Sequence, residues 1–384
     1  MKNKKITQNS GFRFLIVIAI PLAFFIICQF SMSAYWQKMI TLFLINVLLC
    51  ASLNLTNGFT GIFSMGHSGF MAIGAYFTTL LIMSSADKTA RIEGIPGWLA
   101  NVHAPFWVAL LIAGVVALGV AALVGSLVLK AKGDYLSVMT LGLIFIIKGI
   151  VENNDSITNG SRGLSGIPNK LNLLGVLVVL ILSLFILYKV VHSSFGRSML
   201  AIRDDEAAAS SLGIHAAAIK ILSFSIGAFF GAVGGGLWAM LQGTISPSYF
   251  YLNETFQIVE MSVLGGMYTL SGSFYGAAIL TFLPQLLSNL ESGFSIGPVE
   301  VPALYGLSNI IMSIIFILVI MFRPRGVSGT SEFITDTMFS AKTYRDLFHR
   351  ETWQEFADIV KTVFTKNKSK AEVLHTTEKK EEKL

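Results

Sequence analysis

The chain contains a series of apolar runs that are each about as long as a lipid bilayer is thick. A helix that spans a membrane needs about 20 mostly apolar residues. Of the 384 residues, 53% are hydrophobic and only 13% are charged, whereas about a quarter of a soluble domain is charged. This composition excludes an ordinary soluble enzyme and predicts an all-α, polytopic helical membrane protein with about ten spans. The expected spans are 14–30, 39–56, 62–83, 106–129, 134–151, 172–191, 219–241, 255–270, 273–290 and 301–322.

The distribution of basic residues predicts the orientation of these spans. Segment 1–13 is basic and is expected to be cytoplasmic, because Lys and Arg favour the inner side of a membrane. Ten spans return the chain to that side, where Arg323 and Arg325 follow the last span. A single crossing over 255–290 would place this basic end outside. The pair 255–270 and 273–290 is therefore expected to be two short helices broken by glycine.

The predicted organisation has three parts, which are the cytoplasmic segment 1–13, a transmembrane domain over 14–322 and a tail over 323–384. The transmembrane domain carries a cytoplasmic loop at 192–218, and loops 84–105 and 152–171 are expected outside. A charged cytoplasmic tail over 323–384 holds close to half of all charged residues. The first apolar run follows a basic start, as a signal peptide would, but it is longer than a usual signal core and many further spans follow it.

The composition also excludes several kinds of site. The net charge of +6 comes from basic residues spread over the chain ends and between apolar runs, which argues against nucleic-acid binding. Cys28 and Cys50 lie inside apolar runs and do not predict a disulfide, and no Cys/His spacing suits a metal. The sequence lacks a phosphate-binding loop, a nucleophile elbow and a zinc-protease motif. We therefore expect no catalytic residue, no metal and no ATP site in this chain.

A few polar side chains fall inside the apolar runs, where they are costly and usually face protein or water. Lys148 lies near a span end and is expected to reach the interface. His67 suits either a bond to a neighbouring backbone carbonyl or a place in a pathway. Glu260 suits pathway lining or support of a helix break better than proton coupling, because no relay is evident. The candidate translocation-pathway residues are Asn54, Ser64, His67, Ser68, Gln257 and Glu260.

Glycines gather inside two parts of the chain, one in each half. Small residues spaced four apart let membrane helices approach closely, and glycines in broken helices also mark cavities in transporters. Packing alone explains most single positions, and the two groups hint at an internal repeat. The groups are Gly58, Gly61, Gly66, Gly69 and Gly74, and then Gly227, Gly231, Gly234, Gly235, Gly236, Gly265, Gly266, Gly272 and Gly276.

The loop at 192–218 predicts a short cytoplasmic helix. Acidic residues 204–206 suit its first turn, where the helix dipole favours negative charge. The alanines that follow have high helix propensity and give a slim surface, and Gly213 supplies a stop. Such a helix suits insertion into a groove on a partner, although a solvated connection remains the alternative.

Several stretches together resemble a known family. The alanine-rich loop, with Glu206, Ala208, Ala209 and Gly213, resembles the coupling helix of ABC importer permeases, which docks on the ATPase subunit. Over residues 40–329, other motifs resemble the M-type (LivM) permease subunit of branched-chain amino acid transporters. These motifs are 64–76, 133–142, Thr158-Asn159-Gly160 with 163–168, Val263-Leu264-Gly265-Gly266 with Gly272, Ser273 and Gly276, and Arg323-Pro324-Arg325-Gly326.

The resemblance implies an assembly and a mechanism. Such permeases pair with a second, H-type permease, two ABC ATPases that bind ATP and magnesium, and an extracytoplasmic binding protein that would meet loops 84–105 and 152–171. ATP binding would switch the core between outward-open and inward-open states. Substrates in the family are leucine, isoleucine and valine, with relatives for other amino acids, urea or short amides. The implied ATPase-coupling residues are Arg197, Ala201, Arg203, Asp204, Glu206, Ala208, Ala209 and Gly213.

The resemblance also implies a multi-pass protein of a prokaryotic cytoplasmic membrane, in contact with lipid and with no cofactor of its own. Two features depart from the family. Many relatives have a carboxylate where this chain has Gln257, and the tail is longer. Hydrophobic residues three or four apart predict an amphipathic tail helix at about 345–364 that lies on the membrane or on the ATPase. A urea, amide or nucleoside permease and an ion-coupled secondary transporter remain alternative functions.

Overall fold

The computed structural model describes residues 33–128, 135–168, 171–291, 294–296, 299–301, 306–323 and 325–329. The expected first span at 14–30 and the expected tail helix at 345–364 lie outside the described residues. The contacts between residues divide the chain at about position 332.

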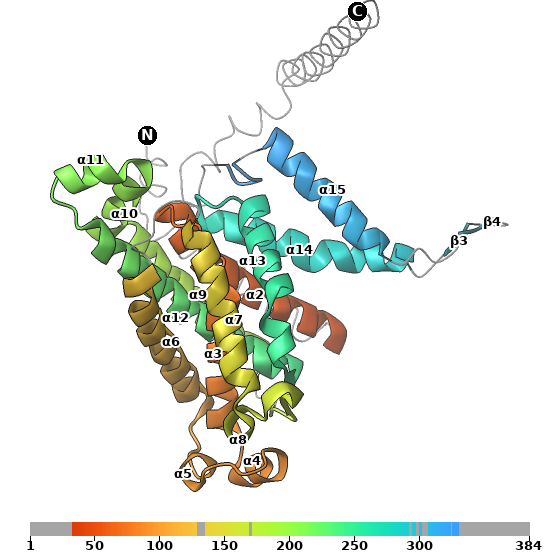
Figure 1. Ribbon diagram of the computed structural model, residues 1–384. Helices are drawn as coiled ribbons and strands as arrows, with labels where there is room; N and C mark the ends of the chain where they lie inside the picture. The colour runs from red at the N-terminus through yellow and green to blue at the C-terminus, as the bar shows by residue number, and fades with distance from the viewer. Residues whose placement is uncertain are drawn as a thin grey trace, which may run out of the picture. The chain divides into compact units, whose positions relative to one another are not determined.

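The described part is almost entirely helical, as the sequence predicts (Figure 1). Its longer helices are α2 (Ala34–Asn54), α3 (His67–Ile82), α6 (Phe106–Val128), α7 (Tyr135–Glu152), α9 (Leu173–Val191), α12 (Ala216–Gln242), α13 (Leu252–Gly265), α14 (Leu270–Glu291) and α15 (Leu307–Phe322). A π-helical turn, η2 (Leu55–Phe59), extends α2.

Short elements connect these helices. They are α4 (Ser85–Arg91), α5 (Gly97–Ala100), α8 (Asp155–Thr158), α10 (Ser194–Asp204), α11 (Glu206–Ser211), and the 3₁₀ turns η3 (Gly160–Arg162) and η4 (Pro247–Phe250). Strands β1 (Leu164–Ser165) and β2 (Thr244–Ile245) pair antiparallel, with Leu164 opposite Ile245. Strands β3 (Phe294–Ile296) and β4 (Val299–Val301) form a separate antiparallel pair.

Six described helices are long and apolar enough to cross a membrane, and α3 with α4 would make a seventh if this pair, bent by 118°, counts as one span. The all-α, polytopic architecture is therefore confirmed, while about ten spans are not. Two of the expected spans are shorter in the structure. α13 ends after 14 residues at Gly265, and α15 has 16 residues. The expected span 62–83 begins only at His67, because residues 61–66 form no helix.

Helix α2 lies at the centre of the bundle. About nine tenths of the residues in its apolar, membrane-spanning stretch are buried, whereas only about a third are buried in α7 and in α9. Several leucines along this helix, including Leu49 and Leu53, are fully buried. α2 packs against α9, α12, α13 and α14, so it joins both halves of the chain.

Helices α3 and α12 approach so closely that their backbones touch. A Cβ atom added at Gly74 would lie 1.9 Å from the Ala232 carbonyl oxygen, and one added at Gly235 would lie 2.1 Å from that of Met71. Close approach of backbones is what small residues permit between membrane helices. The glycines of these two helices therefore serve packing.

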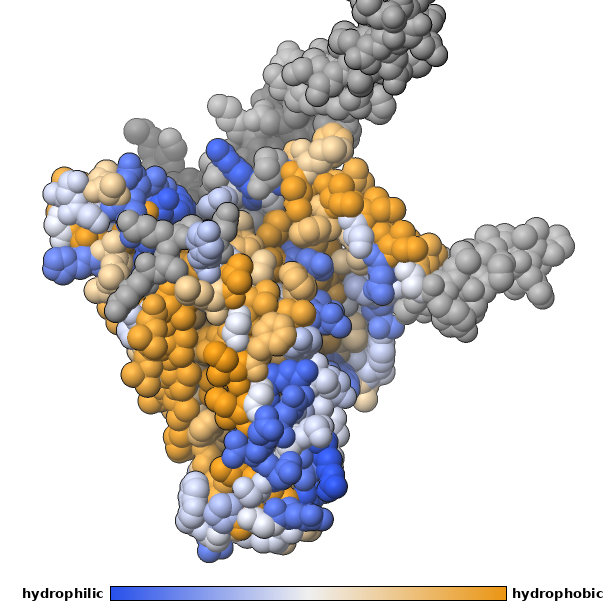
Figure 2. Space-filling model, in the orientation of Figure 1, coloured by the Kyte–Doolittle hydropathy of each residue, from blue (hydrophilic) through white to orange (hydrophobic). Residues whose placement is uncertain are grey.

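Apolar side chains cover α6 and α7 on the face shown in Figure 2. Leu123 and Leu127 of α6 are more than 70% exposed. Few other apolar side chains among the described residues are as exposed. Polar surface gathers at the two ends of this apolar band, at α10–α11 and at α4–α5 (Figures 1 and 2). This distribution suits a protein whose middle is surrounded by lipid.

Candidate functional site: the α10–α11 loop and the broken helices

The predicted alanine-rich helix is two helices in the structure. α10 begins at Ser194 and ends at Asp204, and α11 begins at Glu206. Asp205 separates them with an extended backbone, and its carboxylate accepts hydrogen bonds from the amides of Ala207 (2.9 Å) and Ala208 (3.0 Å). The sequence predicts that the acidic residues lie in a first helical turn, but the strong N-cap preference of aspartate starts a new helix instead.

The outer surface of α11 and of the turn that follows it consists mainly of small side chains and one leucine. Ala207, Ala208 and Gly213 are exposed, and Leu212 is 83% exposed. Gly213 has a positive φ of 84°, and this conformation ends the helix where the sequence predicts a stop. Leu212 therefore presents a large apolar side chain beside the small residues of α11. The sequence reasoning missed Leu212, because hydropathy alone does not tell an exposed leucine from a core one.

The other predicted coupling residues differ in how far they are exposed. Ala209 is buried in a small apolar cluster with Ile202 and Ala216. Glu206 forms an ion pair with Lys220 at 2.8 Å, which ties α11 to the start of α12. Arg197 is exposed on α10, and Ala201 is half-buried.

Arg203 points from α10 into the bundle. Its guanidinium donates a hydrogen bond to the carbonyl of Gly58 in η2 (3.3 Å) and lies over the ring of Tyr268, 5.2 Å from its centre. The same group pairs with Asp204 at 3.0 Å. Arg203 therefore joins α10 to two places where the spans are broken.

The first break follows α2. Its π-helical turn ends at Phe59, and Gly61 has a positive φ of 74°. A Cβ atom at Gly58 would lie 1.6 Å from the carbonyl oxygen of Met267, so the backbones of these two residues are in contact. The first break thus touches the second.

The second break lies between α13 and α14, from Gly266 to Thr269. The amide of Val327 donates to the carbonyl of Leu264, and that of Ser328 donates to the carbonyl of Gly265, both at 2.9 Å. The segment after α15 therefore satisfies carbonyls that the end of α13 leaves open. The glycine-containing turn after α15 therefore packs against the Gly-Gly break between α13 and α14.

Asn54 holds both breaks from the side of α2. Its amide nitrogen donates to the hydroxyl of Ser273 (3.0 Å) and to the carbonyl of Thr269 (3.3 Å). The hydroxyl of Ser262 donates to its side-chain oxygen. A buried side-chain amide with all these partners is a structural bridge.

The other predicted pathway residues of the first half are also hydrogen-bonded inside the bundle. His67 lies 2.7 Å from the hydroxyl of Ser52, and Ser68 lies 2.6 Å from that of Thr255. Ser64 is bonded through its backbone to the side chain of Asn57, at 3.0 and 3.2 Å. All three are buried. For His67, the structure supports the interpretation as a bonded core histidine, with a hydroxyl instead of a carbonyl as partner.

Gln257 and Glu260 lie apart from this group, on α13. With Asn253 they follow one another at the spacing of one helix face. Asn253 and Gln257 are exposed and Glu260 is half-buried. A polar stripe is costly where it faces lipid, so it marks a surface that meets protein or water. Lys148, by contrast, lies 4.1 Å from the ring centre of Tyr251 and pairs with Glu152 at 3.6 Å, which agrees with a structural role.

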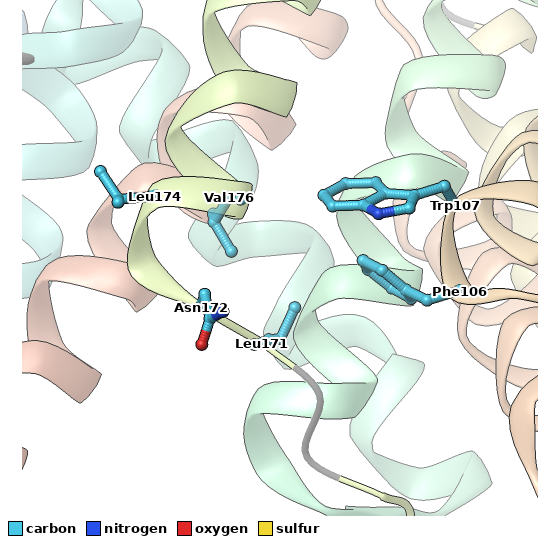
Figure 3. A pocket seen from close by; sticks show the side chains of 7 residues that line it. Phe106, Trp107, Leu171, Asn172, Leu174 and Val176 are labelled. Atoms are coloured by element: carbon cyan, nitrogen blue, oxygen red, sulfur yellow. The ribbon is translucent and has the colours of Figure 1, made fainter.

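A separate pocket lies where α6 and α9 begin (Figure 3). Phe106 and Trp107 of α6 lie opposite Val176 of α9, and Asn172 lies at the edge. The pocket has no charged side chain to hold the carboxylate or ammonium group of an amino acid. Among the described residues, no group of His, Cys, Asp or Glu could hold a metal ion.

Together, the spans, the exposed α11 and the broken helices define a multi-pass membrane permease. Residues 35–322 match the family described as "Branched-chain amino acid transport system / permease component". The chain belongs to this family, and the resemblance to its M-type members is confirmed.

Named relatives support this assignment. The high-affinity branched-chain amino acid transport system permease protein LivM of Escherichia coli (strain K12) is 28% identical over 79% of this chain and 74% of its own length. LivM of Salmonella typhimurium is 28% identical over 75% of this chain and 68% of its own. LivH of Escherichia coli (strain K12) is 25% identical over 74% and 91%. No solved structure matches the chain.

Proposed function

We propose that this chain is a permease subunit of an ABC importer that moves branched-chain amino acids across the cytoplasmic membrane of a prokaryote. The family match over residues 35–322 carries this proposal. The relatives named LivM and LivH suggest that the chain pairs with an H-type permease. Two ATPases that bind ATP and magnesium and an extracytoplasmic binding protein complete the assembly, and this chain itself binds no cofactor.

The proposed topology has ten spans and both termini in the cytoplasm. This count consists of the expected first span at 14–30, the shorter helices α3, α13 and α15, and the six long helices. Segment 1–13 and the tail 323–384 then lie on the same side as α10 and α11. Loops 84–105 and 152–171 lie outside, where the binding protein docks.

The ATPases are proposed to dock on α11. Small side chains over its surface let a groove close around the helix, and Leu212 fills a pocket in that groove. Of the predicted coupling residues, Arg197, Asp204, Ala208 and Gly213 lie on exposed surface. Ala201, Asp204, Glu206 and Ala209 act by holding α10 and α11 in place, whereas Arg203 acts inside the bundle.

The polar stripe of α13 is the proposed lining of the translocation pathway. Asn253, Gln257 and Glu260 form a face that needs a polar neighbour within the membrane, and a second permease placed against it would enclose such a path. The buried Asn54, Ser64, His67 and Ser68 hold the helices that carry this face.

The experiment purifies the tagged full chain from its native cells in mild detergent and identifies the co-purifying proteins by mass spectrometry. We expect an H-type permease and ATPases with phosphate-binding loops. The variant Leu212→Asp should lower the yield of ATPases at least about tenfold, equivalent to about 1.4 kcal/mol of binding.

The matched control is Val102→Asp, which places the same charge on the exposed loop between α5 and α6. It should retain the ATPases. Recovery of the chain without ATPases, together with solute transport by the chain alone, would contradict the proposal.

A further inference from the structure

Arg203 contacts both helix breaks at once. Its guanidinium reaches the carbonyl of Gly58 in η2 and the ring of Tyr268 between α13 and α14. Its aliphatic stem packs on Gly61, where an added Cβ atom would lie 2.8 Å from Cγ of Arg203. Each of these three residues lies in a segment between regular spans.

The two breaks are in direct contact and are therefore expected to move together. The backbone of Gly58 touches the carbonyl of Met267, with no room for a side chain between them. Four residues earlier, Asn54 holds the carbonyl of Thr269 and the hydroxyl of Ser273. A displacement of the turn after α2 therefore also displaces the segment that joins α13 to α14.

Arg203 is also hydrogen-bonded on the side of the α10–α11 loop. Asp204 accepts from Nε at 3.2 Å and from Nη2 at 3.0 Å, which fixes the plane of the guanidinium. The ion pair between Glu206 and Lys220 joins α11 to α12. A planar group that bonds in several directions and stacks on a ring passes on displacement better than a flexible point charge would.

We propose that Arg203 is the residue that passes motion of the α10–α11 loop to the broken helices. It acts as a positioning residue and contacts neither nucleotide nor substrate. When the ATPases move the loop, Arg203 moves the Gly58 and Tyr268 segments together. These segments position α13 and its polar stripe. The proposal rests on the proposed function, since the ATPases supply the motion.

The test uses the full transporter, with both permeases, the ATPases and the binding protein, in liposomes. Leucine uptake and ATP hydrolysis are measured in the same sample, and their ratio is compared between variants. Arg203→Met keeps the stem but removes the guanidinium. We expect it to assemble and to hydrolyse ATP within about twofold of the original protein, while leucine moved per ATP falls at least about tenfold.

Two further variants separate transmission from simple support. Arg203→Lys can make one of the contacts and should lose about threefold in the ratio. Tyr268→Leu removes the ring that Arg203 lies over, at a residue that is 39% exposed, and should also lose about threefold. The control Arg323→Met removes an exposed arginine after α15 and should leave the ratio unchanged.

The outcomes are distinguishable. An original protein that moves no leucine on ATP contradicts the proposed function. An original protein that does so, with an unchanged ratio in Arg203→Met, contradicts the role of Arg203. If Arg203→Met does not assemble, Tyr268→Leu decides, and an unchanged ratio in that variant overturns the proposal.

Discussion

The side-chain nitrogen of Asn54 lies 3.0 Å from the hydroxyl oxygen of Ser273, which is 219 residues further along the chain. This hydrogen bond fastens the central helix α2 to the helix that follows the Gly-Gly break. On its other side, Asn54 accepts a hydrogen bond from Ser262 of α13. One buried amide therefore fixes the position of both halves of a broken segment.

Replacing Asn54 with leucine should destabilise the protein. The substitution keeps the approximate size but leaves the hydroxyls of Ser262 and Ser273 without this partner in the bundle interior. We expect a loss of about 1–2 kcal/mol, visible as a lower thermal midpoint in detergent. Ser126→Ala is the control, because this exposed hydroxyl bonds only within α6 to Leu123, and it should leave the midpoint unchanged. An equal midpoint for Asn54→Leu would contradict the bridging role.

A methyl group at Gly74 should separate α3 from α12. The added Cβ would lie 1.9 Å from a backbone oxygen of Ala232, so a helix has to move to make room. We expect Gly74→Ala to lose most of its folded yield in size-exclusion chromatography. Gly119→Ala has nothing within 4 Å of the new atom and should be neutral or slightly stabilising. Similar yields for the two variants would show that the close approach is not required.

Glu260 should tolerate loss of its charge better than loss of its polarity. If the stripe on α13 lines a pathway, Glu260→Gln retains hydrogen-bonding atoms there, whereas Glu260→Leu breaks the stripe. We expect Gln to keep leucine uptake within about threefold and Leu to lower it at least about tenfold. Uptake that is abolished by Gln and depends on a proton gradient would instead indicate ion coupling.

Arg91 should matter for communication with the binding protein. Its guanidinium donates to the backbone oxygen and, at 3.1 Å, to the hydroxyl of Ser165, which joins α4 to β1. Arg91→Met should lower stimulation of ATP hydrolysis by the loaded binding protein several-fold while leaving the unstimulated rate unchanged. Arg323→Met serves as the control. If stimulation is undiminished in Arg91→Met, this contact has no role in communication with the binding protein.

Hydropathy predicted the long helices well, because lipid imposes length and apolarity on them. The predicted run 106–129 corresponds to α6, and the run 219–241 corresponds to α12. It did not predict where α13 ends or how α2 continues into a π-helical turn. Those features depend on contacts over long sequence distances, such as the backbone of Gly58 against Met267.

The candidate site was predicted only in part. The alanine-rich loop and its glycine stop were recognisable from local propensities. The inward direction of the Arg203 side chain was not recognisable, because the sequence does not show that a charged residue in a loop reaches a carbonyl in another span. The polar residues of the apolar runs were correctly singled out as unusual, yet hydropathy cannot separate the bridging Asn54 from the exposed Gln257.

Energy coupling is the central claim, and the most direct measurement is leucine uptake by the purified transporter in liposomes. The chain, its H-type partner and the ATPases are reconstituted, the binding protein is added outside, and ATP is supplied inside. We predict uptake of leucine, isoleucine and valine that requires ATP and the binding protein and is lost in Leu212→Asp. Uptake by this chain alone, driven by an ion gradient without ATP, would contradict the account.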